Sequence, residues 1–328
     1  MNDLIVQYFM NRPDQFISGE QLSQFLNCSR TAVWKHIQEL KKLGYRFESI
    51  PRKGYKLTQK PDFYHVVELI AACSSSELGR HIHLYDKLES TQTEAHRLVA
   101  NGSGHGTLVI AERQTSGRGR MGRPWHSPAG LGIWMSLVIT PQLALPFASQ
   151  ITLLTAVVLC RTIRKNYQVD IGIKWPNDLL IQARKVSGIL VESSGEDERI
   201  RYMVIGVGIG CNMETEDYPA ELRGIATSLS METGVRIDRT QLIASFLEQF
   251  EELYKLYLEQ GFAPIRILWE SLSVSMHKPI RILSGGDWKE GVALGIDEMG
   301  ALIVRQSNGE ALHVYSGETI IDAGETNI

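Results

Sequence analysis

The sequence predicts an α+β protein with three parts: a winged helix-turn-helix over residues 1–64, a central mixed-sheet domain with flanking helices over 65–272, and a small SH3-like β-barrel over 273–328. Two short amphipathic helix patterns precede a strand–turn–strand pattern in the first part. Strand-like and helix-like segments then alternate. The last part alternates apolar and polar side chains with a period of two, which is typical of antiparallel strands.

The composition is that of a globular protein, with 43% hydrophobic and 22% charged residues. Four cysteines without a C-x-x-C pair argue against a structural zinc site or a disulfide framework, and they suit a reducing cytoplasm. We expect no signal peptide, because Asp3 stands near the start and no basic stretch precedes an apolar run. We also expect no membrane span, since no apolar run approaches the roughly 18 residues required. A cytoplasmic protein without a membrane partner is predicted.

The first sixty residues are basic, with ten Lys/Arg against five Asp/Glu, although the whole chain has a net charge of −3. Ser18 and Gln21 form a capping-box pattern that starts a short helix. A break at Asn27 separates it from a second helix over about 30–43. A hairpin with a basic turn follows, in the position of a wing. This arrangement predicts a winged helix-turn-helix that binds DNA.

The exposed side of the second helix and the tip of the wing carry the groups that reach phosphates and base edges. The candidate DNA-binding residues are Ser29, Arg30, Thr31, Trp34, Lys35, Arg52 and Lys53. The alternative is a helical hairpin used only for packing or for contact with another protein.

The central domain is expected to contain strands near 83–88, 107–112, 131–139, 171–175, 185–193 and 201–210 and helices over 147–167 and 239–260. Between two of these strands lies GRGRMGRPW, which has the G-x-G-x-x-G spacing of a dinucleotide-binding turn. A dinucleotide site needs a helix that starts on the glycines, and Pro124 with the loop residues after it prevents that start. The bulky Arg118, Arg120 and Met121 would also obstruct a pyrophosphate. We therefore reject the Rossmann interpretation.

The same segment is better interpreted as a mobile lid that delivers Arg118, Arg120 and Arg123 to a ligand. Guanidinium groups pair bidentately with phosphate or carboxylate oxygens, and the glycines allow the loop to fold over what is bound. A solvated basic loop is the alternative. Two later segments favour the lid: KWPND ends a strand at Asp178, and Lys185 opens the next strand. Together these groups suit a reaction that brings a carboxylate to a triphosphate.

Three motifs in this order, GRGRMGRPW, KWPNDL and KVSGILVE, resemble those of the biotin–protein ligases. With the helix-turn-helix before them, the chain is similar over its whole length to the bifunctional members, which also repress the biotin biosynthetic operon. The resemblance implies that biotin and ATP are converted to biotinyl-5′-AMP, and that the biotinyl group passes to a lysine in the acceptor domain of biotin-dependent carboxylases. It also implies Mg²⁺ that accompanies ATP, no tightly bound metal, operator DNA as a partner, and a homodimer when the adenylate is bound.

The resemblance also implies roles for individual residues. The catalytic residues are Lys185, Arg118 and Arg120. The residues implied to bind biotin are Ser90, Thr91, Gln92, Gln114, Arg118, Gly119, Arg120, Lys185 and Gly188. The residues implied to bind the nucleotide are Arg118, Arg120, Arg123, Trp125, Asn177, Asp178 and Asn212.

Two other functions remain open from the sequence. A transcription regulator that senses a small molecule without turnover would keep the helix-turn-helix but would not need Lys185 beside the arginine lid. A lipoate-type ligase shares the broader fold. The C-terminal strands assist with ATP or the acceptor in the family, and simple structural capping is the alternative for them.

Overall fold

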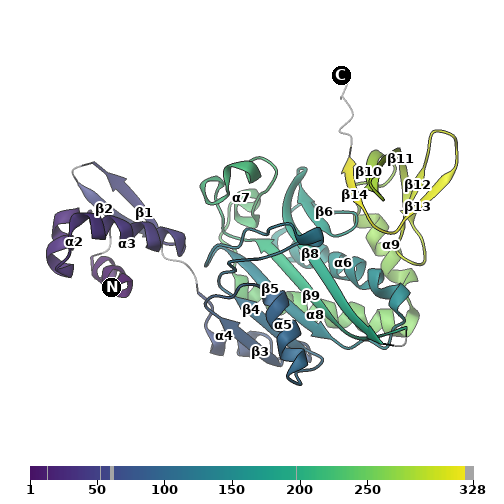
Figure 1. The fold of residues 1–328 in the computed structure, drawn as a ribbon, viewed down its shortest axis with the longest axis horizontal. Coiled ribbons are helices and arrows are strands. Elements are labelled where there is room, and N and C mark those ends of the chain that lie inside the picture. Colours follow the sequence, from purple (N-terminus) through teal and green to yellow (C-terminus); the bar gives the residue numbers. More distant parts are fainter. Residues whose placement is uncertain (13, 52, 60–62, 197, 322–328) are drawn as a thin grey trace. The chain divides into compact units, whose positions relative to one another are not determined.

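The computed structural model describes residues 1–12, 14–51, 53–59, 63–196 and 198–321 (Figure 1). The chain forms two compact units. One contains Met1–Phe63 with Ser127–Leu131, and the other contains Tyr64–His126 with Gly132–Ile328. The central and C-terminal parts share the second unit, so the boundary placed near residue 272 stays a prediction.

The N-terminal unit is a winged helix-turn-helix, as predicted. Its elements are α1 (Asn2–Met10), α2 (Gly19–Leu26), α3 (Arg30–Lys42), β1 (Arg46–Ile50) and β2 (Gly54–Gln59). The capping box is present: Gln21 N donates to Ser18 Oγ at 3.1 Å and Ser18 N donates to Gln21 Oε1 at 2.8 Å. Asn27 ends α2 in the left-handed conformation, with φ of 49°. Helix α1 was not anticipated, yet it contributes the buried Ile5 and Phe9 to this core.

The second unit is built on a mixed seven-stranded sheet in the order β3-β4-β5-β9-β8-β7-β6. Its strands are β3 (His81–Tyr85), β4 (Thr107–Ala111), β5 (Gly132–Ile139), β6 (Ile171–Lys174), β7 (Asp178–Ile181), β8 (Arg184–Glu196) and β9 (Arg199–Gly210). Only β3 and β4 pair in parallel within this sheet as described, and the other neighbours are antiparallel. The mixed sheet is therefore confirmed.

Helices cover the two faces of this sheet unequally (Figure 1). The long helices α6 (Ala148–Tyr167) and α8 (Arg239–Gln260), with α9 (Ala263–Leu272), pack on the face that holds the main core. Helix α5 (Thr91–Ala100) covers part of the other face, where Ala95 and Leu98 meet Val109, Val138 and Val204. The short helices are α4 (Val66–Ala72) and α7 (Leu229–Thr233). Because α5 covers only part of its face, the amino end of this helix lies beside a part of the sheet that no helix covers.

We expected no segment that is long and apolar enough to span a membrane. Judged by length and composition alone, that expectation was wrong. Residues Leu145–Tyr167 form such a segment, with a mean hydropathy of 1.4 over its most apolar window. Its basic residues are confined to the last turns, which leaves a long apolar stretch before them. The segment is 67% buried within this fold, where its side chains pack against α8, α9 and the sheet. Burial of this kind is typical of a core helix.

The C-terminal strands form an antiparallel sheet, as expected. They are β10 (Pro279–Ser284), β11 (Asp287–Ile296), β12 (Leu302–Arg305), β13 (Ala311–Val314) and β14 (Glu318–Ile321). Their order is β13-β12-β11-β10-β14, so the last strand crosses over to pair with β10. Ser149 Oγ and Gln150 Nε2 of α6 donate to the carbonyls of Met299 and Glu298, which fixes this sheet to the central domain.

Candidate functional site

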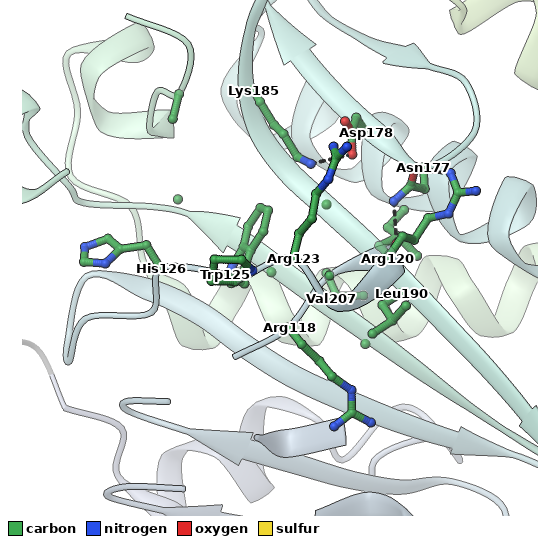
Figure 2. A pocket seen from close by; sticks show the side chains of 18 of the residues that line it. Arg118, Arg120, Arg123, Trp125, His126, Asn177, Asp178, Lys185, Leu190 and Val207 are labelled. Atoms are coloured by element: carbon green, nitrogen blue, oxygen red, sulfur yellow. Dashed lines mark hydrogen bonds and ion pairs between the residues drawn. The ribbon is translucent and has the colours of Figure 1, made fainter. Parts of the chain in front are cut away.

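A cavity of about 380 Å³ opens on the face of the central sheet that α5 covers in part (Figure 2). Segments from most of the central domain enclose it. They are the amino end of α5, the loop between β4 and β5, strand β5, the segment from β6 to the start of β7, strands β8 and β9 with the segment that follows β9, and the start of β14. Residues far apart in the sequence therefore meet at one place.

The predicted biotin and nucleotide residues converge on this cavity with one exception. Those that line it are Ser90, Thr91, Gln92, Gln114, Arg118, Gly119, Arg120, Arg123, Trp125, Asn177, Asp178, Lys185 and Gly188. The exception is Asn212, which is absent from the lining. Its Nδ2 donates to the carbonyl of Ile237 at 3.0 Å and its Oδ1 accepts from Ile237 N at 2.8 Å. Both ends of this buried amide therefore brace the chain before α8, and a contact of Asn212 with the nucleotide stays a prediction.

Other lining residues were missed from the sequence. Among them are His126, Trp134, Gly317, Glu318 and Thr319. His126 adjoins the arginine motif, and its Nε2 lies 2.8 Å from the carbonyl of Asp217. Trp134 could have been found from the period of two along β5, where it pairs with Gly208 of the cavity floor. The three C-terminal residues carried no signal, since only the fold brings them to the cavity.

A rigid polar corner forms at the amino end of α5. Gln114 Oε1 accepts from Thr91 N at 2.8 Å and lies 3.1 Å from Thr91 Oγ1. Gln92 Nε2 donates to the carbonyl of Val204 at 3.0 Å, and its Oε1 lies 3.0 Å from Ser136 Oγ. Ser90 caps the helix without a side-chain hydrogen bond to the helix backbone, so capping does not occupy its hydroxyl. These fixed donors and acceptors suit a small polar group that must be held in one orientation.

The floor of the cavity consists of glycine residues of β8 and β9. Trp125 packs directly against them, which leaves no room for a side chain at these positions. Gly188 of β8 and Gly208 of β9 are paired across the sheet. A Cβ at Gly208 would stand 2.4 Å from Trp125 Nε1, and one at Gly188 would stand 2.9 Å from Trp125 Cζ3. Any side chain at these positions would displace the indole, so the glycines provide close approach rather than flexibility.

The cationic groups of the site are anchored rather than solvated. Lys185 Nζ lies 2.6 Å from Asp178 Oδ1 and 5.1 Å from the ring centre of Trp125. Arg120 Nη1 donates to Asn177 Oδ1 at 3.3 Å and to the carbonyl of Gly317 at 3.2 Å. Burial lowers the pKa of Arg120, as expected of a cation withdrawn from water.

The remaining arginines of the loop have partners too. Arg123 forms an ion pair with Glu318, and Arg118 pairs with Glu192. In Figure 2, Arg118 points away from Lys185 and Asp178. The loop is therefore not a free basic loop. That it moves and orders when a ligand binds stays a prediction.

A buried ion pair holds both ends of the arginine loop, which is the segment between β4 and β5 that contains GRGRMGRPW. Glu112 precedes the loop and Gly132 begins the strand after it. Arg239 Nη1 lies 3.0 Å from Glu112 Oε2 and donates to the carbonyl of Gly132 at 3.0 Å. Tyr64 stacks under this guanidinium, 4.0 Å from the ring centre to Cζ, and its backbone N–H donates to Glu112. The core thus holds both ends of the loop in place.

Neither the three buried cysteines nor a cluster of metal ligands offers a catalytic group within the part of the chain that the structure describes. Burial raises the pKa of Cys160 and Cys211 to about 12 and that of Cys73 to about 11, so these cysteines are thiols at neutral pH. Among the described residues, no group of three or more His, Cys, Asp or Glu side chains could hold a metal ion. The arrangement suits the binding and polarisation of substrates by fixed charges.

The candidate DNA-binding residues lie at the start of α3 and in the wing. Ser29 caps the helix by accepting from Ala32 N at 3.2 Å, and Arg30 forms an ion pair with Glu20. Thr31, Trp34 and Lys35 are exposed, with 53% of Trp34 accessible. Lys53 is exposed in the turn of the wing, and Arg52 lies outside the described residues. That these residues contact DNA stays a prediction.

Comparisons with known proteins agree with this geometry. Residues 85–210 match the biotin/lipoate A/B protein ligase family, residues 3–56 an HTH domain, and residues 278–321 the biotin protein ligase C terminal domain. The chain is 44% identical over 316 residues to the bifunctional ligase/repressor BirA of Bacillus subtilis, with 96% of each chain covered. It is 32% identical to the bifunctional ligase/repressor BirA of Escherichia coli over 89% of each chain. The biotin protein ligase from Aquifex aeolicus in complex with biotin and ATP superposes with a TM-score of 0.63 at 28% identity, covering 74% of this chain and 98% of that one.

Proposed function

Because this chain belongs to the biotin protein ligase family, with bifunctional ligase/repressors among its relatives, we propose that it makes biotinyl-5′-AMP from biotin and ATP, transfers the biotinyl group to a lysine of a carboxylase acceptor domain, and represses biotin biosynthesis genes. One observation carries the proposal. A single cavity combines a glycine and tryptophan floor, a fixed polar corner at α5, and the cations Lys185 and Arg120. This combination suits a small apolar acid that must meet a triphosphate.

The two substrates have distinct places in this proposal. The ureido ring of biotin lies at the polar corner formed by Ser90, Thr91 and Gln114. The apolar part of biotin packs on Trp125 and Leu190. The biotin carboxylate then extends toward Lys185. The nucleotide occupies the side bounded by Asn177, Arg123 and the segment after β9.

The chemistry proceeds by two displacements. A carboxylate oxygen of biotin attacks the α-phosphorus of ATP, and pyrophosphate leaves. The ammonium of Lys185 and the guanidinium of Arg120 stabilise the negative charge that grows on the α-phosphate. The amine of the acceptor lysine then attacks the acyl carbon, and AMP leaves. The protein supplies charge and position but no covalent nucleophile.

Mg²⁺ accompanies ATP in this proposal and neutralises phosphate charge. Carboxylates are the side-chain ligands that Mg²⁺ prefers, and the cavity is lined by two, Asp178 and Glu318. Each is ion-paired, with Lys185 and Arg123 respectively. We therefore assign no protein ligand to the metal.

The proposal is tested by exchange of labelled pyrophosphate into ATP. A ligase catalyses this exchange only when biotin is present, because the exchange reverses adenylate formation. A regulator that senses a ligand without turnover gives no exchange, and a lipoate-type ligase gives exchange with lipoate instead. Either result would contradict the proposed function.

Replacing Arg120 with alanine should release the adenylate from the site about tenfold faster. Arg120 links the loop to Asn177 and to Gly317, so its loss removes hydrogen bonds that close the loop, each made by a charged donor. Adenylate retention is measured by rapid gel filtration of preformed complex. Parental retention in Arg120→Ala would show that this arginine does not hold the loop closed.

In the repressor function that we propose, α3 binds operator DNA and the wing lies beside it. Two copies of the chain associate when the adenylate is bound. Half-sites read by a helix-turn-helix usually require such a symmetric pair. We also propose a cytoplasmic location, where acceptor proteins and DNA are both present. Light scattering with and without biotin and ATP tests the association.

Affinity for operator DNA should fall steeply with salt, with a log–log slope of about −0.9 for each phosphate neutralised. Lys35→Ala should make that slope shallower by about 1, since Lys35 is exposed at the start of α3. Fluorescence anisotropy over a salt series measures this slope. Lys165→Ala, on an exposed position of α6, serves as the control. An unchanged slope in Lys35→Ala would remove this lysine from the DNA contact.

A further inference from the structure

The last residue of the KVSGILVE motif, Glu192, lies on the same face of the sheet as the cavity. Strands β8 and β9 pair Gly188 with Gly208, Leu190 with Gly206, and Glu192 with Val204. Paired residues of antiparallel strands point to one face, and alternate residues of a strand share it. Gly188 and Leu190 line the cavity, so Glu192 stands one step beyond them, where α5 packs.

Glu192 receives the first arginine of the loop. Arg118 Nη2 lies 3.0 Å from Glu192 Oε2 and 3.3 Å from Oε1. The other end of the same guanidinium, Nη1, donates to Thr93 Oγ1 of α5 at 2.7 Å. One side chain thus joins the loop both to β8 and to α5. About a third of each partner's side chain is exposed, 35% for Arg118 and 33% for Glu192.

A second group holds the carboxylate in place. His96 Nε2 of α5 lies 3.0 Å from Glu192 Oε2, and His96 Nδ1 lies 3.1 Å from Tyr202 Oη of β9. Burial works against ionisation of Glu192, but hydrogen bonds from His96 and Arg118 outweigh it and lower the pKa of this carboxyl group. A carboxylate that is held by α5 and stays ionised is a fixed anchor for a mobile cation.

We propose that Glu192 is a positioning residue for retention of the adenylate, acting through Arg118 to keep the arginine loop closed over the activated intermediate. Arg120 and Arg123 attach the loop on the side of β14. The Arg118–Glu192 pair attaches it on the opposite side, to β8 and α5. The inference rests on the proposed function, because it concerns retention of the adenylate made at that site.

The variant Glu192→Gln tests this inference, because it keeps the shape of the side chain and removes its charge. Release of preformed biotinyl-adenylate should become about fivefold to tenfold faster, the range for losing a charged hydrogen bond that is partly exposed. Pyrophosphate exchange at saturating biotin and ATP should stay within about twofold of the parent. A matched control is Glu196→Gln, which makes the same change at an exposed position of β8, where the carboxylate pairs with Arg201 and not with the loop. It should release adenylate at the parental rate.

A double-mutant cycle separates positioning from a purely structural role. If Glu192 acts through Arg118, the double variant Arg118→Ala with Glu192→Gln should release adenylate no faster than Arg118→Ala alone. Additive effects, or equal effects of Glu192→Gln and Glu196→Gln, would contradict the proposal. So would parental release by a Glu192→Gln protein that unfolds at the parental temperature.

A second readout does not depend on adenylate formation. Trypsin cleaves after the arginines of the loop when the loop is open, so ligand-free Glu192→Gln should be cut within 117–123 several times faster than the parent or Glu196→Gln. If the parent forms no adenylate, the proposed function fails while this comparison still tests the anchor. Equal cleavage rates in all three proteins would overturn the role of Glu192.

Discussion

Lys185→Ala should slow formation of biotinyl-adenylate about 10²–10³-fold, which is the usual cost of removing one charge-stabilising donor from a transition state. The ammonium is held between Asp178, at 2.6 Å, and the ring of Trp125. It is therefore positioned before any substrate arrives and need not be reorganised during the reaction. Biotin-dependent pyrophosphate exchange measures the loss.

Two comparisons make this result specific. Lys165→Ala, which changes an exposed lysine of α6 away from the cavity lining, should exchange at the parental rate. Transfer from chemically prepared biotinyl-adenylate to the acceptor should suffer less than adenylate formation does in Lys185→Ala, because the acceptor amine attacks carbon and no bond to phosphorus is formed in that step. Normal exchange in Lys185→Ala would refute the catalytic role.

Gly208→Val should reduce kcat/KM for biotin by about 10²-fold or more. A Cβ at this position would stand 2.4 Å from Trp125 Nε1, so the indole must leave the floor of the cavity. The displaced indole would shift the arginine loop as well, because Trp125 lies in that loop two residues after Arg123. Misplacement of substrates by about 1 Å costs on the order of 10²-fold in rate.

The matched control is Gly224→Val, at a glycine where an added Cβ meets nothing within 4 Å. Gly224 has a φ of 87°, at which any side chain strains the backbone. Gly224→Val therefore reports the effect of backbone strain without contact with Trp125. Gly208→Val should bind biotin far more weakly than Gly224→Val when both are measured by calorimetry. Equal affinities would show that contact with the indole is not what the glycine preserves.

Much of the fold could be predicted because its signals are local. The capping box at Ser18 and the apolar stripe of α8 need only a few neighbouring residues to be recognised. Segments such as β7 and β14, with four residues each, are too short for a periodic signal. Strand β14 forms because β10 offers it a partner, and that partner lies some forty residues earlier.

The site was predicted as a set of residues but not as a set of contacts. The three arginines were recognised from GRGRMGRPW, yet their partners Glu192, Gly317 and Glu318 come from distant strands. Asn212 lies two residues after a cavity strand, yet its side chain hydrogen-bonds to Ile237 instead of lining the cavity. Position along a strand is readable from sequence, but the direction of the chain after the strand depends on the packing around it.

The most direct test of the account is a crystal structure of the chain grown with biotin and a non-hydrolysable ATP analogue. The ureido ring should contact Ser90, Thr91 and Gln114, and the α-phosphate should lie within hydrogen-bonding reach of Lys185 beneath a closed arginine loop. Ligands bound at another surface, or a loop that leaves both substrates uncovered, would contradict the proposal that this cavity joins the two molecules.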